Sequence, residues 1–190
     1  WERAEAAGVR LIQVFDFEWL GRRSAVENRL MGLFRAGDAI GARECALSKI
    51  ERGEASRFFR EFHTQGPGST PVVVYGLRHG EKLVACMSFG MNRFGKEGWE
   101  LLRYATAGRV QGGFNRLLKA FLTDRKPDIL TSFCDLRWGN GEVYKQAGFV
   151  LDGVTAPDYW YVDKRGDYAA SRFAAQKRPT GQSERDWADA

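Results

Sequence analysis

Apolar runs separated by polar segments are clearest between residues 71 and 106, where they predict three neighbouring β-strands. Apolar side chains fill residues 71–77 and 82–89, and the polar turn 78–81 separates them. Two such runs joined by a tight turn are typical of a β-hairpin. A third apolar run covers 99–106. We therefore expect these segments to form the centre of a sheet.

Three segments have the spacing of amphipathic helices. Ser24 and Glu27 form a capping box that predicts a helix ending near Gly37. A second helix is expected over 54–62, with its phenylalanines facing inward. The strongest pattern follows Gly112-Gly113, where apolar residues recur at intervals of three and four.

The remaining apolar runs are shorter. They predict buried strands at 9–15, 39–47 and 129–134, and a final strand pair at 149–154 and 159–162. A short helix is expected over 142–147. Together these elements predict the α/β (α+β) class, with helices flanking a central sheet.

Length and composition indicate a globular protein. The chain has 190 residues, which is ordinary for one domain with an appendage. No apolar run approaches the roughly 20 residues of a membrane-spanning helix. The opening WERAEAAG is charged, so we expect no secretory signal peptide and no membrane partner. It also lacks an initiator Met, as in a fragment.

Cysteine and histidine are too few and too scattered for the common zinc sites. Cys45, Cys86 and Cys134 lie in separate apolar segments, and none forms a CxxC pair. His63 and His79 are also far apart. The sequence argues against a disulfide framework, a zinc protease and a zinc deaminase, and we expect no metal site.

Positive charge is concentrated in one stretch. The chain carries 29 basic and 24 acidic residues, a net charge of +5, and residues 102–126 hold six basic residues against Asp124 alone. This stretch predicts an anionic partner, either nucleic acid or a phosphate-bearing cofactor. The alternative is a solvated helix face.

A glycine-rich turn, residues 108–113, lies between the third strand and the strongest helix. Backbone N–H groups at such a helix start bind anions well. The element order, this turn and the later segment EVYKQAGF (142–149) resemble the GCN5-related N-acetyltransferase (GNAT) fold. The resemblance implies a mixed, mostly antiparallel sheet flanked by helices.

The GNAT resemblance also implies roles for residues of the turn and of the later segment. Tyr144 would protonate the leaving group, and the turn would hold an acyl or aminoacyl donor, acetyl-CoA being one such donor. The family motif has Arg or Gln where this chain has Val110, and a second Gly where it has Asn115. The implied donor-binding residues are Val110, Gln111, Gly112, Gly113, Asn115 and Arg116.

A closer resemblance covers nearly the whole chain. Runs such as RLIQVFDFEW, FHTQG and SFCDLRWGNGEVYKQAGF are similar to phage proteins in which a GNAT-like region follows a Vsr-like homing-endonuclease segment. This resemblance implies a nuclease-derived strand and helix at 1–35, a GNAT-like domain at 36–162 and a polar tail at 163–190. The GNAT-like region also distantly resembles the Mom-type phage proteins, which modify adenine in DNA and so protect it from restriction.

Four side chains are candidates for proton transfer. Asp135 follows a buried strand, at an edge where α/β sheets bind ligands. Tyr144 and His63 are expected at the same site, and Glu100 is a carboxylate inside an apolar strand. The alternatives are structural: a loop cap, a core tyrosine, a half-buried histidine, and an ion pair with Arg103.

Five residues are candidates for nucleic-acid contacts, since the resemblance to the Mom-type proteins implies a DNA substrate. Arg137 and Trp138 would clamp or stack on a flipped base, unless they simply pack in their loop. Arg103, Arg109 and Lys119 would contact phosphates. We therefore expect a GNAT-like transferase that modifies a base, preferably adenine, of double-stranded DNA in the cytoplasm of a phage-infected or prophage-bearing bacterium. The alternatives are a non-catalytic DNA-binding module of a homing endonuclease and an ordinary acetyl-CoA-dependent N-acetyltransferase.

Overall fold

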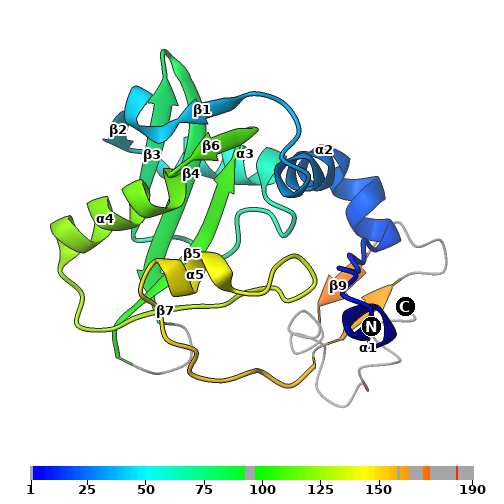
Figure 1. The fold of residues 1–190 in the computed structure, drawn as a ribbon. Coiled ribbons are helices and arrows are strands. Elements are labelled where there is room, and N and C mark those ends of the chain that lie inside the picture. The colour runs from blue at the N-terminus through cyan, green and yellow to red at the C-terminus, as the bar shows by residue number, and fades with distance from the viewer. Residues whose placement is uncertain (1, 93–96, 158, 163–168, 172–182, 184–190) are drawn as a thin grey trace.

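A five-stranded mixed sheet forms the centre of the protein in the computed structural model, which describes residues 2–92, 97–157, 159–162, 169–171 and 183 (Figure 1). Its strand order is β2-β3-β4-β5-β7, and all neighbours are antiparallel except the parallel pair β5–β7. This arrangement confirms the predicted mixed, mostly antiparallel sheet. The strands are β2 Ala46–Lys49, β3 Val73–His79, β4 Lys82–Met91, β5 Trp99–Thr106 and β7 Leu130–Ser132.

Two helices pack against the sheet, each with its own hydrophobic cluster. Helix α4 (Gly113–Arg125) packs against β3 and β4, where the fully buried rings of Phe89 and Phe121 stack with centroids 3.7 Å apart. Helix α3 (Arg52–Phe62) contributes Phe58 and Phe59 to a second cluster. Both helices form where their apolar spacing predicts them, because each buries its apolar face against strands.

The N-terminal part differs from its prediction. Residues 9–15 form no strand, and Val9 and Leu11 are exposed. Helix α2 (Asp16–Leu33) begins well before Ser24, because the Glu18 carboxylate accepts a hydrogen bond from the Phe15 N–H. The helix has non-helical dihedrals at Arg22, so the predicted capping box lies at the start of its second half. Helix α2 packs against α3, and α1 (Glu2–Ala6) precedes it.

The predicted strand at 39–47 is divided into two. Strand β1 (Ala39–Gly41) pairs in parallel with β6 (Arg109–Gln111), outside the main sheet. A 3₁₀ turn over Ala42–Glu44 then redirects the chain into β2. Because β1 pairs with the residues just before α4, it lies beside the start of that helix.

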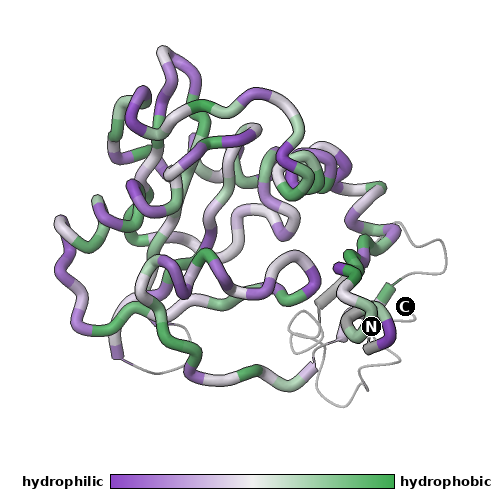
Figure 2. Tube along the Cα trace, viewed as in Figure 1, coloured by the Kyte–Doolittle hydropathy of each residue, from purple (hydrophilic) through white to green (hydrophobic). Residues whose placement is uncertain are grey.

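The C-terminal strand pair also differs. Residues 149–154 have no regular structure, and this segment runs along the lower part of the molecule (Figure 2). Val150, Leu151 and Val154 in this segment are exposed. Asp152 and Gly153 interrupt this run, and both residue types disfavour strands. Strand β8 (Trp160–Val162) instead pairs with β9 (Ala169–Ser171), within the predicted tail. The rest of that tail lies outside the described residues, apart from Ser183.

Within the described residues, no helix combines the length and the apolar composition that crossing a membrane requires.

Candidate functional site

The parallel strands β5 and β7 pair over only three positions, from Trp99 and Leu130 to Leu101 and Ser132. Beyond that point β7 no longer pairs with β5. At this end of β5, two backbone carbonyls accept hydrogen bonds from side chains. The Arg103 guanidinium donates to the Leu102 carbonyl at 2.7 Å, and Asn28 of α2 donates to the Thr106 carbonyl at 2.7 Å.

A β-bulge lies where the two strands part. On β4, Phe89 faces Leu101 and the adjacent Ser88 faces Arg103, so Leu102 is an extra residue in β5. Leu101 therefore belongs to the cluster under α4, whereas Arg103 lies on the opposite side and donates to the Gly66 carbonyl after α3 at 3.0 Å. Strict alternation along β5 would put the side chains of Leu101 and Arg103 on the same face of the sheet, and the bulge at Leu102 puts them on opposite faces.

Arg137 holds two carboxylates from distant parts of the chain. Its guanidinium donates two 3.0 Å hydrogen bonds to Glu18 of α2 and bonds of 2.8 and 3.2 Å to Asp135. It also lies 4.7 Å from the centre of the Phe15 ring. Burial alone lowers the pKa of Arg137, but the two carboxylates outweigh that effect and raise it. We name these three side chains the Glu18–Arg137–Asp135 cluster.

Asp135 is the centre of a wider hydrogen-bond network. Besides the guanidinium, its carboxylate accepts the backbone N–H of Arg137 at 3.1 Å and the side-chain amide of Gln65 at 3.2 Å. Most lone pairs of this carboxylate are therefore engaged. The geometry gives Asp135 the role of positioning Arg137 and the loop after α3.

His63 ends α3 and faces three arginines. Its Nδ1 accepts the backbone N–H of Gln65 at 3.1 Å, which assigns the proton of the neutral ring to Nε2. The pKa of His63 is lowered to about 3, with burial as the largest cause. The charges of Arg103, Arg29 and Arg22 lower this pKa as well, and the charge of Asp135 opposes them. His63 is thus a neutral hydrogen-bond donor at neutral pH, and a weak base.

The depressed pKa of His63 predicts acid sensitivity. Its ordinary value is near 6.5, so between that pH and about 3 the unfolded chain binds a proton that the folded protein does not. The free energy of unfolding therefore falls as the pH is lowered through this window, by at most about 1.4 kcal/mol per pH unit from this group. Urea denaturation of wild type and His63→Gln between pH 7 and pH 4.5 measures the effect. We expect a shallower loss of stability in the variant, and equal slopes would contradict the assignment.

Tyr144 lies on α5 (Glu142–Gln146), close to where β5 and β7 part. Its ring makes edge contacts with Phe114 and Phe149. Burial raises the pKa of Tyr144, while a hydrogen bond with Ser132 of β7 and the charges of Arg29 and Arg103 act against that rise. The hydroxyl therefore stays protonated at neutral pH and is available as a proton donor.

Glu100 is buried in the paired part of the sheet. It lies opposite Gly90 on β4 and Thr131 on β7, just before the bulge, and its residue is 1% exposed. The backbone of Glu100 is therefore paired on both sides within the sheet. Along β5, Glu100 comes before the bulge at Leu102 and Arg103 comes after it.

The glycine turn before α4 is enclosed by neighbouring backbone and side chains. Val110 and Gln111 lie in β6, paired with β1, and Val110 packs against the core. The N–H of Phe114 donates to the Tyr104 hydroxyl, and a Cβ added at Gly113 would lie 3.0 Å from the same hydroxyl. Gly112 caps α4 in the left-handed region, with φ at +76°, and Asn115 is exposed.

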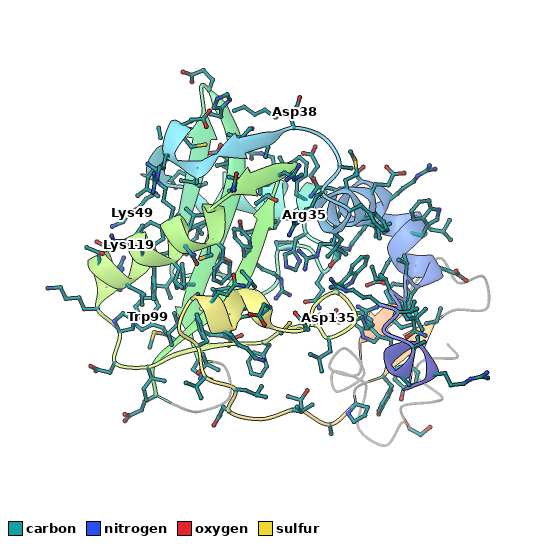
Figure 3. The ribbon with its side chains drawn as sticks, viewed as in Figure 1. Arg35, Asp38, Lys49, Trp99, Lys119 and Asp135 are labelled. Carbon is teal, nitrogen blue, oxygen red and sulfur yellow. The ribbon has the colours of Figure 1, made fainter. Side chains whose placement is uncertain are left out.

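The other predicted anion-binding residues are dispersed. Arg109 donates to the carbonyls of Arg35 and Gly37, and Arg116 donates to the Ala42 carbonyl. Lys119 is exposed on α4, on the opposite side of the view from Asp135 (Figure 3). Trp138 is 3% exposed, so its ring packs inside the loop and presents no face to a base. The sequence stretch 102–126 therefore forms no single basic face.

The residues that sequence reasoning missed come mainly from the N-terminal segment. Arg22 and Arg29 share the helical spacing of the buried Ala25 and Val26, at i, i+3, i+4 and i+7. Two arginines in helical line with apolar residues are a detectable signal in the sequence. Glu18 and Gln65 have no comparable pattern, since their partners Arg137 and Asp135 are far away in sequence.

Among the described residues, no three His, Cys, Asp or Glu side chains gather in a way that could hold a metal ion. No match was found when the chain was compared with protein-family models, with curated proteins or with solved structures.

Proposed function

We propose that this chain is a GNAT-like transferase that modifies a nucleobase of DNA at an exocyclic amino group, as in adenine, and so protects that DNA from restriction in a bacterial cytoplasm. The observation that carries the proposal is the protonated Tyr144 hydroxyl at the point where β5 and β7 part. Arg29 and Arg103 lie close enough to act on its pKa. This combines a proton donor with positive charge at one end of the sheet.

The proposed chemistry is acyl transfer to an amine. The amine nitrogen attacks the acyl carbon, a new C–N bond forms, and the bond from that carbon to the leaving group breaks. Tyr144 gives its proton to the leaving group, and the resulting phenolate is stabilised by the charges of Arg29 and Arg103. The amine releases one proton to solvent, from which Tyr144 is reprotonated.

The donor is an acyl or aminoacyl compound, and coenzyme A fits the glycine turn poorly. The Phe114 N–H already donates to Tyr104, and β1 pairs with the residues before α4. These contacts compete with a pyrophosphate at the helix start. We therefore assign no step of the reaction to coenzyme A at this position.

The test is mass spectrometry of nucleosides from plasmid DNA in cells that express the wild type, Tyr144→Phe or Tyr159→Phe. We expect a new nucleoside mass with the wild type and with Tyr159→Phe, whose residue is exposed. We expect none with Tyr144→Phe. Unmodified DNA in every culture, together with tight salt-dependent duplex binding by the purified protein, would instead support a DNA-binding module without catalysis.

A further inference from the structure

Three arginines of the N-terminal segment have no acidic partner among the described residues. Arg29 acts on the pKa of both Tyr144 and His63, Arg22 acts on that of His63, and Arg10 acts on that of Arg29. The ion pairs between described residues involve other side chains, and none includes Arg10, Arg22 or Arg29. Arg10 and Arg29 both donate to the backbone carbonyl of Trp138, at 2.6 and 3.4 Å. We name Arg10, Arg22 and Arg29 the arginine triad.

Two glycines after α3 make room for guanidinium groups. Gly66 and Gly68 have φ values of +69° and +72°, which other residues rarely adopt. A Cβ at Gly66 would collide with the Arg22 guanidinium, and a Cβ at Gly68 would lie 2.9 Å from that of Arg103. The loop backbone therefore lies directly against both side chains.

Arg29 carries its positive charge at a cost in free energy. Burial lowers the pKa of Arg29, and the positive charge of Arg10 lowers it further. The nearby groups that oppose this effect are Cys134, Tyr144 and Tyr104, none of them a carboxylate. Arg29 is nevertheless exposed to solvent, so a dissolved ligand can reach it. Cations held together without a counter-charge are the arrangement that an anion stabilises.

We propose that Arg22 and Arg29, with Arg10, bind a phosphate group beside Tyr144 and His63. Guanidinium groups donate several hydrogen bonds in a planar fork that matches phosphate oxygens. His63 adds a neutral Nε2–H donor from the opposite element, α3. The phosphate belongs to the DNA strand or to a nucleotide-containing donor, and both present the same phosphate oxygens.

This inference deepens the proposed function and rests on it for the source of the phosphate, but not for binding itself. It places the phosphate site on the kinked helix α2 instead of on the glycine turn before α4. The two locations are separable by mutation, because none of the arginine triad comes from the turn or from α4.

The test measures binding of four probes to the purified chain by calorimetry at low salt: pyrophosphate, coenzyme A, a 12-nucleotide single strand and a 12-base-pair duplex. We expect Arg22→Met and Arg29→Met each to weaken binding of at least one probe by tenfold or more. The matched control is Arg23→Met, on the same helix and paired with Glu27. Equal affinities in all four proteins, or no binding of any probe by the wild type, would overturn the proposal.

Folding of the variants has its own control. The Trp138 carbonyl keeps the hydrogen bond from Arg10 when Arg29 is replaced, and removal of Arg29 relieves repulsion with Arg10. We therefore expect the melting temperature of Arg29→Met without ligand to equal or exceed that of wild type. A lower melting temperature would mean that Arg29 serves structure, and would contradict the proposal.

A readout on His63 is independent of catalysis. The chain has two histidines, and His79 lies exposed at the end of β3. A bound phosphate favours the protonated imidazole and should raise the pKa of His63 above about 3, visible in NMR titrations. We expect this change in wild type and not in the double variant Arg22→Met, Arg29→Met. If the probes bind and shift His63 while cellular DNA stays unmodified, the phosphate site stands and the proposed transferase activity fails.

Preference among the probes identifies the source. Stronger binding of the oligonucleotides assigns the phosphate to DNA. Stronger binding of coenzyme A or pyrophosphate assigns it to the donor. Either result supports the site, and both patterns should weaken as salt rises.

Discussion

Replacing Arg137 with methionine is expected to lower the free energy of unfolding by about 3 kcal/mol. The substitution leaves Glu18, which is 4% exposed, as a buried carboxylate without its cation. It also removes the cation shared by Asp135. Breaking a buried pair from one side is costly because the remaining charge keeps its desolvation penalty. Urea denaturation at pH 7 measures the loss.

The control for this prediction removes the charges together. In the triple variant Glu18→Gln, Asp135→Asn, Arg137→Met, no carboxylate of the cluster is left unpaired, so we expect more than half of the lost stability to return. Arg23→Met, which disrupts an exposed pair with Glu27, should cost less than about 1 kcal/mol. If Arg137→Met unfolds at the same urea concentration as wild type, Arg137 does not hold this cluster together.

The second large effect is expected on turnover. Tyr144→Phe keeps the ring contacts with Phe114 and Phe149 but removes the hydroxyl beside Ser132. Loss of a positioned proton donor costs about 100-fold or more in rate. We therefore expect single-turnover modification of a duplex oligonucleotide to slow by that factor, while DNA affinity and melting temperature stay near wild type.

Ser132→Ala tests the hydrogen-bond partner of Tyr144 separately from the Tyr144 hydroxyl itself. This variant keeps the Tyr144 hydroxyl and removes the side-chain partner on β7, so we expect a smaller loss of rate than in Tyr144→Phe. A rate for Tyr144→Phe within threefold of wild type would exclude Tyr144 as the proton donor. The proposal would then lose the residue on which it depends.

The sheet centre and the main helices were predictable because their evidence is local. The hairpin of β3 and β4 follows from two apolar runs with a tight turn, and α4 follows from repeated apolar spacing. Residues 9–15 have the same apolar character but no strand beside them, so they form no sheet. An apolar run predicts a strand only where the fold supplies a neighbouring strand.

The site was predictable only in part, for a related reason. Asp135, Tyr144 and His63 were selected from their own segments, and His63 and Tyr144 are both within electrostatic reach of Arg29 and Arg103. The bulge at Leu102 and the contact of Arg137 with Glu18 depend on pairs distant in sequence. No periodic pattern in a single sequence records such contacts.

The kink of α2 at Arg22 has a consequence for truncation. The first half of the helix supplies Glu18 to the Arg137 loop, and the second supplies Asn28 to the end of β5. A chain that starts at residue 36 would keep all five strands of the central sheet, but it would lose these two tethers and the whole arginine triad. Residues 1–35 therefore form part of the site. Replacing or deleting them as a module would remove the side chains that they contribute to it.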